Sequence, residues 1–340
     1  MKYKFLGNSG LEVSEMCFGA MSLTGKDGWS HIANVDQKQA NRLVDLALDS
    51  GVNFFDTADI YSHGNSEKML GKAIKDKRSE TVIATKCGFR MKTGPNSDGL
   101  SRRRIIEACE ASLKRLDTDY IDLYQIHSFD FMTPLEESLS AFDQLIRNGK
   151  VRYIGCSNFS AWHLMKALAI QDNFGWERFI SLQAYYSLVG RDIEWELIPL
   201  CEDQGLGIMV WSPLHGGFLT GKYRDNEKRP ENSRLKGPED ALPFDKNKGF
   251  KILEELDEMA QDKNITIAQL ALSYSLHKQG LTSLVVGVRN ASQLKENIEA
   301  GEIKLTSDEM QALDKISEPY KPYPQWYFDI FRKERNENFK

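Results

Sequence analysis

Apolar residues recur at two different spacings along the 340-residue chain, and the two spacings alternate. From residue 37 to about 50, apolar side chains stand three and four positions apart, which is the spacing of one helix face. This pattern stops at Gly51, and the short apolar run NFFD follows at once. The segment therefore predicts a helix that ends at a glycine and leads directly into a strand.

The same order of helix, glycine and strand returns along the chain. Helices are expected near 134–148, 194–204 and 266–279, each ending at a glycine and each followed by an apolar run. A further helix near 101–116 opens with Ser101, a favourable helix cap. In all, eight strands are expected, at MCFGA, NFFDT, TVIATK, YIDLYQIH, VRYIGCS, FISLQ, GIMVWS and SLVVG.

The expected strands are short, rich in Val, Ile and Phe, and mostly without polar alternation, as parallel strands covered on both faces are. Eight strand–helix units in one undivided chain predict an α/β fold of the (β/α)8 TIM-barrel type, with a doubly wound sheet as the alternative. The Rossmann form of that alternative is disfavoured because the chain has no G-x-G-x-x-G. We expect one domain over 1–340, with the barrel at about 16–318.

Three segments fall outside this alternation. The opening KYKFLGNSGLEVSEM predicts a hairpin that closes the barrel floor, and residues 215–247 form a long, polar, Pro- and Gly-containing stretch. The third is the aromatic tail at about 319–340, for which we expect an additional helix and a terminal extension. Long irregular segments in a compact domain are usually functional covers or disordered ends, so the middle segment is expected to cover a cofactor or substrate.

Composition and charge exclude several classes of partner. A net charge of -5 with a pI near 5.8 gives no electrostatic reason to expect nucleic acid or an anionic membrane. The N-terminus lacks the apolar core of a signal peptide, and no apolar run approaches the roughly 18 residues of a membrane span, so a cytoplasmic location is expected. The five cysteines contain no CxxC pair and the histidines no HExxH, so we expect reduced thiols and no metal.

Polar residues that end the apolar runs carry the candidate chemistry, because reactive groups in such barrels gather at the C-terminal ends of strands. The second strand ends in Asp56 with Tyr61 five residues on, the third in Lys86 and the fourth in His127. Singly, each residue type has an ordinary structural role as a cap, a rim residue, a snorkelling side chain or a buried imidazole. Together they make an acid catalyst: the carboxylate orients the ammonium, the ammonium stabilises a phenolate, and the phenol protonates a carbonyl oxygen that the imidazole positions.

The chain resembles the aldo-keto reductase family over nearly its whole length, in particular bacterial-type members related to potassium-channel β-subunit-like reductases. The matching pieces are GNSGLEVSEMCFGAM, NFFDTADIYSHGNSEKMLGKAI, TK at 85–86, DYIDLYQIH, GKVRYIGCSNFS, LQAYYS, VWSPLHGGFLTGKY and GVRNASQLKEN. The resemblance implies a catalytic tetrad of Asp56, Tyr61, Lys86 and His127, with Tyr61 as general acid or base. It also implies an extended nicotinamide cofactor across the barrel mouth.

The resemblance further implies which residues contact that cofactor. Ser157, Asn158 and Gln183 would face the carboxamide, and Trp211 would stack on the nicotinamide ring. The pyrophosphate would lie along a loop that contributes Ser212, Leu214, Gly216, Leu219, Gly221 and Lys222. This loop, GGFLTGKY, approaches a Walker A motif, but Tyr223 stands where that motif needs Ser or Thr. A glycine-rich turn with one ammonium suits either ligand, so only the resemblance assigns the phosphate to a dinucleotide.

The last unit bears on the choice of nicotinamide cofactor. Arg289 follows the final strand, and Asn290 or Ser292 would cap the next helix. A guanidinium at a helix N-terminus is a sound site for a 2′-phosphate, so NADP(H) is favoured over NADH. The alternative is that Arg289 is an exposed loop residue. By resemblance, Gly287, Gln293, Glu296 and Asn297 complete the adenine end of the site.

The sequence leaves the substrate open: an aldehyde or ketone reduced to its alcohol, or the reverse, with sugar-derived compounds among the candidates. Trp29, His31 and the tail aromatics are either substrate contacts or ordinary packing across the barrel rim. These tail residues are Tyr320, Tyr323, Trp326, Tyr327, Phe328 and Phe331. Family members include monomers and oligomers, so a homo-oligomer is compatible with the sequence.

Two other functions compete with this interpretation. Auxiliary β subunits of potassium channels share this fold and retain the tetrad, which leaves a non-metabolic binding role as the alternative. That role is disfavoured because no long extension precedes the expected barrel. A barrel glycosidase needs two carboxyl groups flanking the scissile bond, and no such acidic pair is apparent at the strand ends.

Overall fold

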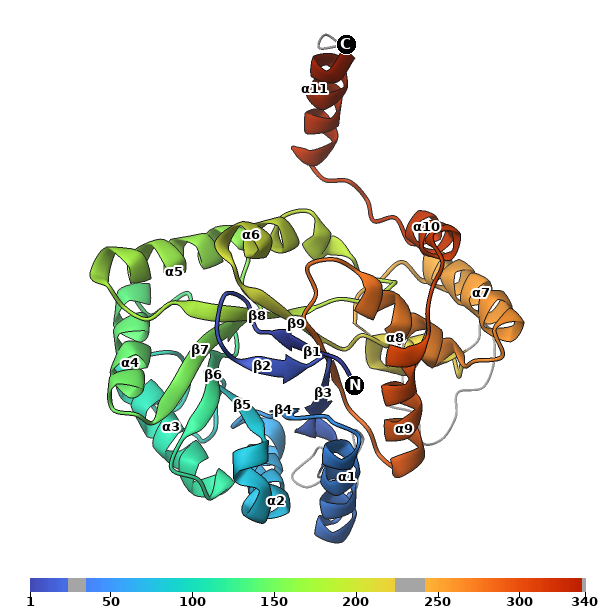
Figure 1. Cartoon of the computed structure of the whole chain (residues 1–340). Coiled ribbons are helices and arrows are strands. Elements are labelled where there is room, and N and C mark those ends of the chain that lie inside the picture. Colours follow the sequence, from blue (N-terminus) through green and yellow to red (C-terminus); the bar gives the residue numbers. More distant parts are fainter. Residues whose placement is uncertain (24–34, 224–241, 338–340) are drawn as a thin grey trace.

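The computed structural model describes residues 1–23, 35–223 and 242–337, and among them parallel strands close into an eight-stranded barrel (Figure 1). Around the barrel the strand order is β10-β3-β4-β5-β6-β7-β8-β9. The strands are β3 (Met16–Gly19), β4 (Phe54–Asp56), β5 (Val82–Cys87), β6 (Ile121–Ile126), β7 (Val151–Ser157), β8 (Phe179–Tyr185), β9 (Gly207–Trp211) and β10 (Ser283–Val286). The TIM-barrel prediction and all eight expected strands are thus confirmed.

Helices surround the barrel on its outside (Figure 1). They are α1 (Gln37–Asp49), α2 (Asn65–Ile74), α3 (Arg102–Leu116), α4 (Leu135–Arg147), α5 (Ala161–Phe174), α6 (Leu197–Gln204), α7 (Lys246–Asp262), α8 (Ile267–His277), α9 (Ala291–Glu299) and α10 (Ser307–Ile316), while α11 (Gln325–Glu337) extends away from the barrel. Within the described residues, none of these helices is long and apolar enough to cross a membrane.

The helices begin and end at residues that are favourable at those positions. Ser101 caps α3 by accepting a hydrogen bond from the backbone N–H of Arg104, as its position predicted. Gly51 and Gly205 follow the ends of α1 and α6 with φ values of 83° and 70°, a conformation that costs glycine little. The helix expected from about 194 begins later, at Leu197, because residues 192–194 form a separate 3-10 turn.

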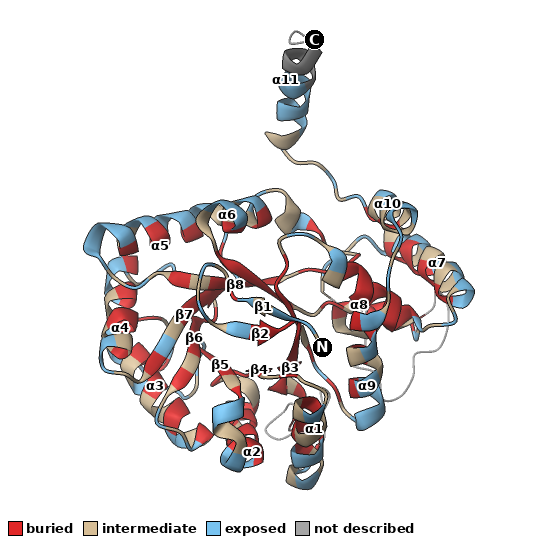
Figure 2. Ribbon diagram, viewed as in Figure 1, coloured by how far each residue is buried: buried red, intermediate tan, exposed pale blue. Residues whose placement is uncertain are grey.

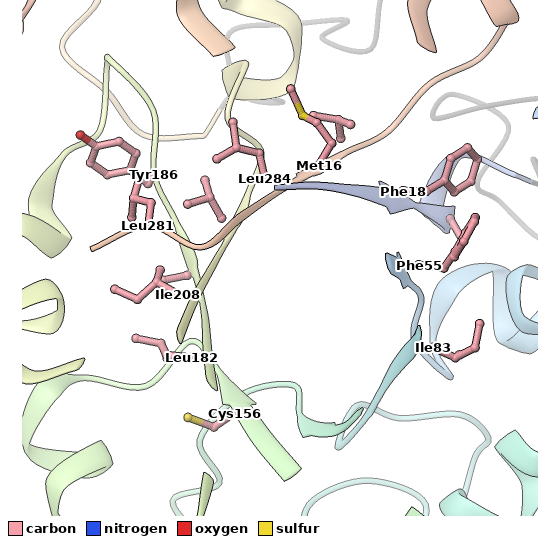
Figure 3. Close-up of a cluster of buried hydrophobic side chains, with 14 of the residues drawn as sticks. Met16, Phe18, Phe55, Ile83, Cys156, Leu182, Tyr186, Ile208, Leu281 and Leu284 are labelled. Carbon is pink, nitrogen blue, oxygen red and sulfur yellow. The ribbon is translucent and has the colours of Figure 1, made fainter. Parts of the chain in front are cut away.

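Most of the core lies between the strands and the helices. Phe18, Phe55 and Leu182 belong to this outer cluster, and Figure 3 shows their side chains beside the ring of strands. Figure 2 shows the same division, because the strands and inward helix faces are buried while the outer helix faces are exposed. Burial on both faces explains why the strands lack polar alternation.

A two-stranded hairpin, β1 (Tyr3–Phe5) and β2 (Glu12–Ser14), covers one end of the barrel (Figure 1). Leu6 and Val13 pack with Cys17, Phe54 and other inward-facing strand residues in a second, smaller cluster. The backbone N–H of Asn8 also donates to the carbonyl of Gly205, just before β9, at 2.7 Å. The hairpin therefore closes the N-terminal floor, as expected, and leaves the opposite mouth for chemistry.

The remaining irregular segments differ from one another. Residues 215–220 form the 3-10 segment η5 (His215–Thr220), and the expected cover continues into residues outside the described part of the chain. Trp29 and His31 also lie outside the described residues. The aromatic tail contains α11, which stands away from the barrel beyond α10 (Figure 1).

Candidate active site

A cavity of about 700 Å3 opens at the C-terminal ends of the strands, within the usual 300–1,000 Å3 range for small-molecule sites. The last residues of β3, β4, β7, β9 and β10 all line it. Its lining includes these residues predicted from the sequence: Asp56, Tyr61, His127, Ser157, Asn158, Gln183, Trp211, Ser212, Leu214, Gly216, Lys222, Gly287, Arg289, Gln293, Glu296 and Asn297. Residues at or near the ends of all eight barrel strands, together with residues of α9, thus line one cavity.

Lys86 is completely buried beneath this cavity and links Asp56 to Tyr61. Its ammonium donates to Asp56 Oδ2 at 2.7 Å, to the Thr57 carbonyl at 2.8 Å and to Tyr61 Oη at 3.3 Å. Burial by itself lowers the pKa of Lys86, but the Asp56 carboxylate and Tyr61 outweigh it, so the pKa is raised above its usual value. The lysine is therefore charged and aimed at the phenol.

Asp56 is held in place from its other side by two amides. Gln183 Nε2 donates to Asp56 Oδ1 at 2.8 Å, and Gln125 Nε2 approaches the same oxygen at 3.4 Å. Gln183, predicted as a cofactor contact, thus lines the cavity while its amide nitrogen holds the Asp56 carboxylate. Gln125 was not predicted from the sequence, although a polar residue near the end of the apolar run YIDLYQIH was a usable signal.

Tyr61 and His127 face each other at the cavity. Tyr61 begins η2 (Tyr61–Gly64), a turn in which Ser62 and His63 adopt positive φ values of 45° and 49°, unusual for residues other than glycine. His127 follows β6, and its ring meets the Tyr61 ring edge-on with centroids 5.8 Å apart. The turn after β4 therefore brings the phenol back beside the end of β6.

His127 is prepared to act as a neutral imidazole. Burial, aided by the nearby Lys86 charge, lowers the pKa of His127 well below its ordinary value. Among the described residues, none hydrogen-bonds its Nδ1 atom. A neutral ring with unused hydrogen-bonding capacity can hold a polar group of a bound ligand.

Residues at the ends of β7 and β9 form the part of the lining next to His127. Ser157 at the end of β7 is buried, and its Oγ has no hydrogen-bond partner among the described residues. Asn158 donates from Nδ2 to the His127 carbonyl at 2.9 Å and accepts at Oδ1 from Trp211 Nε1 at 3.0 Å. A buried hydroxyl facing a cavity is costly unless a bound group satisfies it, so Ser157 indicates a polar ligand at this position.

The glycine-containing loop after β9 forms the next part of the lining. Ser212 Oγ accepts from the backbone N–H of Gly216 at 3.0 Å, and Gly216 and Gly217 have φ values of 62° and 95°. Lys222 supplies a cation at the edge of the cavity. Leu219 and Gly221, predicted in the same group, are not among the lining residues, and the Leu219 side chain is buried in the outer core.

The far end of the cavity lies at the start of α9. Asn290 caps this helix by accepting from the backbone N–H of Gln293 at 2.9 Å, so Asn290 rather than Ser292 fills that role. Gln293 Oε1 in turn accepts from the backbone N–H of Arg289 at 2.9 Å. Glu296 accepts from Thr266 Oγ1 at 2.6 Å. The first two bonds hold the loop that carries Arg289 at the helix N-terminus, and the third joins α9 to the cap of α8.

Several lining residues were not predicted from the sequence. They include Met21 and Ser22 after β3, Ile60 before Tyr61, and Phe89 after β5. The Phe89 ring meets His127 with centroids 4.5 Å apart. The sequence signal for these residues was their position just beyond a strand end rather than their chemistry.

Other site chemistries receive no support within the described residues. No group of three His, Cys, Asp or Glu residues there is arranged to hold a metal. All five cysteines are free and buried, and burial raises the pKa of Cys109 and of Cys201 to about 12, which disfavours thiolate formation. Of the lining carboxyl groups, Asp56 is paired with Lys86, so it is unsuited to glycosidase acid–base work.

Comparison with known proteins agrees with this geometry. Residues 15–318 match the profile of the "Aldo/keto reductase family". The chain is 35% identical to versiconal hemiacetal acetate reductase of Aspergillus parasiticus, covering 95% of this chain and 98% of the relative. It is 34% identical to norsolorinic acid reductase of Aspergillus flavus, covering 92% and 80%. A protein of Arabidopsis thaliana named "Probable voltage-gated potassium channel subunit beta" is 36% identical, covering 89% and 92%.

These matches extend over nearly the whole barrel, and oxidoreductases are among the relatives. The cavity combines a charged lysine, a phenol and a neutral imidazole at the end of the barrel where such enzymes carry their chemistry. The chain therefore belongs to the aldo/keto reductase family and is an oxidoreductase of that family.

Proposed function

We propose that this protein uses NADP(H) to reduce an aldehyde or ketone to the alcohol, or to run the reverse oxidation, with Tyr61 as general acid or base. The observation that carries the proposal is the position of the Lys86 ammonium, 2.7 Å from Asp56 Oδ2 and 3.3 Å from Tyr61 Oη. An ammonium at that position stabilises the phenolate that remains after Tyr61 gives up its proton. This arrangement suits proton transfer to a carbonyl oxygen.

The residues along the cavity fit a nicotinamide dinucleotide. The unsatisfied Ser157 hydroxyl would hold the carboxamide, with Asn158 and Gln183 beside it, and Trp211 would lie against the ring. The backbone of the loop at 212–222 and Lys222 would hold the pyrophosphate. When bound, the cofactor supplies the hydride that the side chains of this protein cannot supply.

The protein's own groups would then divide the remaining work. His127 donates a hydrogen bond that holds the substrate oxygen beside Tyr61, and its lowered pKa keeps it neutral during turnover. Tyr61 transfers its proton to that oxygen, while Lys86 stabilises the phenolate and Asp56 keeps Lys86 oriented. In alcohol oxidation the same groups act in reverse, with the phenolate accepting the proton.

The preference for NADP(H) over NADH rests on Arg289. This residue lines the cavity at the N-terminus of α9, where the guanidinium and the helix dipole would both favour a 2′-phosphate. Gln293, Glu296 and Asn297 on the same helix would contact the adenosine.

Apolar side chains around Tyr61 and His127 favour an apolar or aromatic carbonyl compound. Met21, Ile60, Phe89 and Trp211 all line the cavity, and the Phe89 ring lies against that of His127. The aromatic tail residues do not line it, so the cavity offers no tail aromatics on which a sugar would stack. The reductases among the relatives, named for versiconal hemiacetal acetate and norsolorinic acid, agree with an organic carbonyl substrate.

The test is Tyr61→Phe, measured by the NADPH-dependent reduction of a panel of aryl and alkyl aldehydes. We expect kcat to fall by at least about 100-fold, the usual scale for loss of a general acid, while the quench of tryptophan fluorescence by NADPH is retained. Tyr120→Phe is the matched control, because Tyr120 packs between Arg78 and Arg152 away from the cavity. Full activity of the Tyr61→Phe protein would refute the role of Tyr61.

The relatives named as channel β subunits support one alternative: the same site retained in a protein whose role is to bind a partner. Steady turnover of many equivalents of NADPH with a small carbonyl compound would favour the enzyme. A single slow turnover with tight cofactor retention would favour the binding role. For either role we propose a cytoplasmic location, which the five buried free thiols support.

A further inference from the structure

We propose that α11 and the linker before it form an arm through which two copies of this chain dimerise, each arm packing on the barrel rim of the other copy. The arm is defined as residues 320–332. The receiving surface, here called the rim patch, consists of Phe131, Met132, Trp162 and Met165. The inference concerns assembly and does not depend on the proposed reaction.

The arm has no buried face. Every side chain from 326 to 332 is exposed, although the apolar ones occur at the spacing of a packed helix: Trp326 and Ile330, then Tyr327 and Phe331. A helix of 13 residues is marginal alone in water, because most helix stability in proteins comes from packing an apolar face. The arm therefore needs a surface to pack against.

The arm exposes about as much apolar surface as one partner buries in a standard protein–protein interface. Five large apolar side chains of α11 are about half exposed, and Tyr320 and Tyr323 of the linker are 86% and 72% exposed. An aromatic side chain offers roughly 150–250 Å2, so the arm presents on the order of 800 Å2. The largest apolar patch of a typical monomer is about 300–600 Å2, whereas a standard interface buries about 800 Å2 per partner.

The root of the arm is fixed to the barrel, which directs the arm outward (Figure 1). Gln325 Nε2 donates to the Trp195 carbonyl at 3.2 Å, and the Lys321 ammonium lies 5.6 Å from the centre of the Trp195 ring. Lys248 also donates to the Glu318 carbonyl. Beyond this root, the arm lies outside the region matched by the family profile, and its residues do not line the active-site cavity.

The rim patch is the second exposed apolar surface, and its loop is firmly held. Asp130 accepts from the backbone N–H of Met132 and of Leu100, each at 2.8 Å, and from Thr133 Oγ1 at 2.6 Å. These bonds hold the loop in a conformation that leaves Phe131 80% and Met132 90% exposed. A loop fixed by three hydrogen bonds so that it shows large apolar side chains to solvent is typical of a contact surface.

Trp162 and Met165, on the first turns of α5, extend the rim patch. The Trp162 ring lies 6.4 Å from Phe129, which in turn packs 5.0 Å from Phe131, measured between ring centroids. Aromatic and methionine side chains are enriched in the cores of protein interfaces, and methionine sulfur packs favourably against aromatic rings. The chemistry of the rim patch thus matches that of the arm.

A second copy of the chain is the occupant that covers both surfaces at once. In a two-fold dimer each arm meets the same surface on its partner, so one contact, made twice, buries both arms and both rim patches. Pairing of two α11 helices with each other would leave both rim patches in water. The reciprocal exchange accounts for both unpartnered surfaces with a single interface.

The first test is the mass of the full chain in solution, measured by light scattering and sedimentation velocity from 0.1 to 50 μM in the same buffer. We expect twice the 38.8 kDa of one chain. The double variant Tyr327→Asp/Phe331→Asp and the rim variant Phe131→Asp/Met132→Asp should each weaken dimerisation by at least 100-fold and behave as monomers. Far-UV circular dichroism and the thermal midpoint report whether each variant is folded.

The matched control is Phe174→Asp, since Phe174 at the end of α5 is 54% exposed and Phe331 is 53% exposed. It adds one charge to an exposed aromatic site outside the arm and the rim patch, so this variant should remain a dimer. A dimer that survives the arm variant would overturn the role of the arm. A dimer lost in the arm variant but kept in the rim variant would overturn the rim patch as the receiving surface.

Cross-linking distinguishes a second copy from an arm that folds back on its own barrel. Two differently tagged chains, one carrying Phe328→Cys and one Met132→Cys, are mixed and treated with a short bismaleimide. All five native cysteines are buried, so the introduced thiols are the accessible targets. A covalent product carrying both tags is expected. A monomeric wild type, with cross-linking only inside a chain that carries both substitutions, would overturn the proposal.

Discussion

The buried pair of Lys86 and Asp56 should contribute to folding as well as to chemistry, and a double-mutant cycle can separate the two. The variants are Lys86→Met, Asp56→Asn and the two combined. Both side chains are almost wholly buried, and their charged atoms lie 2.7 Å apart. Each single substitution leaves an uncompensated charge in the barrel interior, whereas the double substitution removes both charges.

The distance between the two charges sets the expected loss in free energy of unfolding. At 2.7 Å and an effective dielectric constant near 20, the attraction is about 6 kcal/mol, most of which offsets the loss of hydration of the two ions. Breaking one side of such a pair costs about 3–5 kcal/mol. Removing both charges should cost only about 0–2 kcal/mol, because Gln183 can still hydrogen-bond the new amide. The double variant should thus be more stable than either single variant.

Urea unfolding at pH 7, followed by circular dichroism, provides the free energies of unfolding. Each single variant should lose about 1 M or more in midpoint, and the double variant should recover most of that loss. All three variants should lack reductase activity. The double variant should therefore be nearly as stable as the wild type but inactive, which separates the effect of the pair on folding from its effect on chemistry. The control is the exposed pair Lys150 and Glu110, where Lys150→Met should cost less than about 1 kcal/mol. Additive losses in the double variant would refute the reasoning.

Two further predictions concern the cofactor and pH. Arg289→Ala should lower the affinity for NADPH by about 10- to 100-fold and leave the affinity for NADH nearly unchanged. Both affinities are measured by fluorescence titration, and an unchanged ratio of the two affinities would place the 2′-phosphate elsewhere. Burial lowers the pKa of His215 to about 4 in the folded protein, whereas an unfolded histidine has a pKa of about 6.5. Between pH 6.5 and pH 4 the native state therefore binds fewer protons than the unfolded state, and the free energy of unfolding decreases as the pH falls through this range. His215→Gln should therefore reduce the difference in unfolding free energy between pH 7 and pH 4.5 by about 2–3 kcal/mol. The control is His63→Gln, because His63 is exposed. Equal pH dependence of the wild type and the His215→Gln variant would contradict this prediction.

Local sequence patterns were sufficient to predict the barrel and part of its site. Glycine stops such as Gly51 and Gly205, and the cap at Ser101, act within a few residues of themselves. Apolar strands covered on both faces predicted a parallel sheet, and the fold type then placed Asp56, Lys86 and His127 at one end. Each of these inferences needs only short-range geometry or a rule common to all such barrels.

Other features depended on which strands meet and in what register. The pairing of β5 with β6 sets Lys86 beside Gln125, which brings that amide to Asp56. The contact of Asn158 with Trp211 joins residues 53 positions apart. Burial also keeps His127 neutral, and no residue adjacent in sequence indicates this.

The sequence by itself determined the fold class, the strand ends and the residue types available for acid catalysis, because these follow from period, capping and chirality along a local stretch of chain. Only the tertiary structure decided that Gln183 orients Asp56, that Phe89 and Met21 form part of the lining, and that α11 stands exposed beyond the barrel. The physical reason is that hydrogen bonds, desolvation and exposure are properties of neighbours in space, and closing the barrel makes neighbours of residues far apart in the chain.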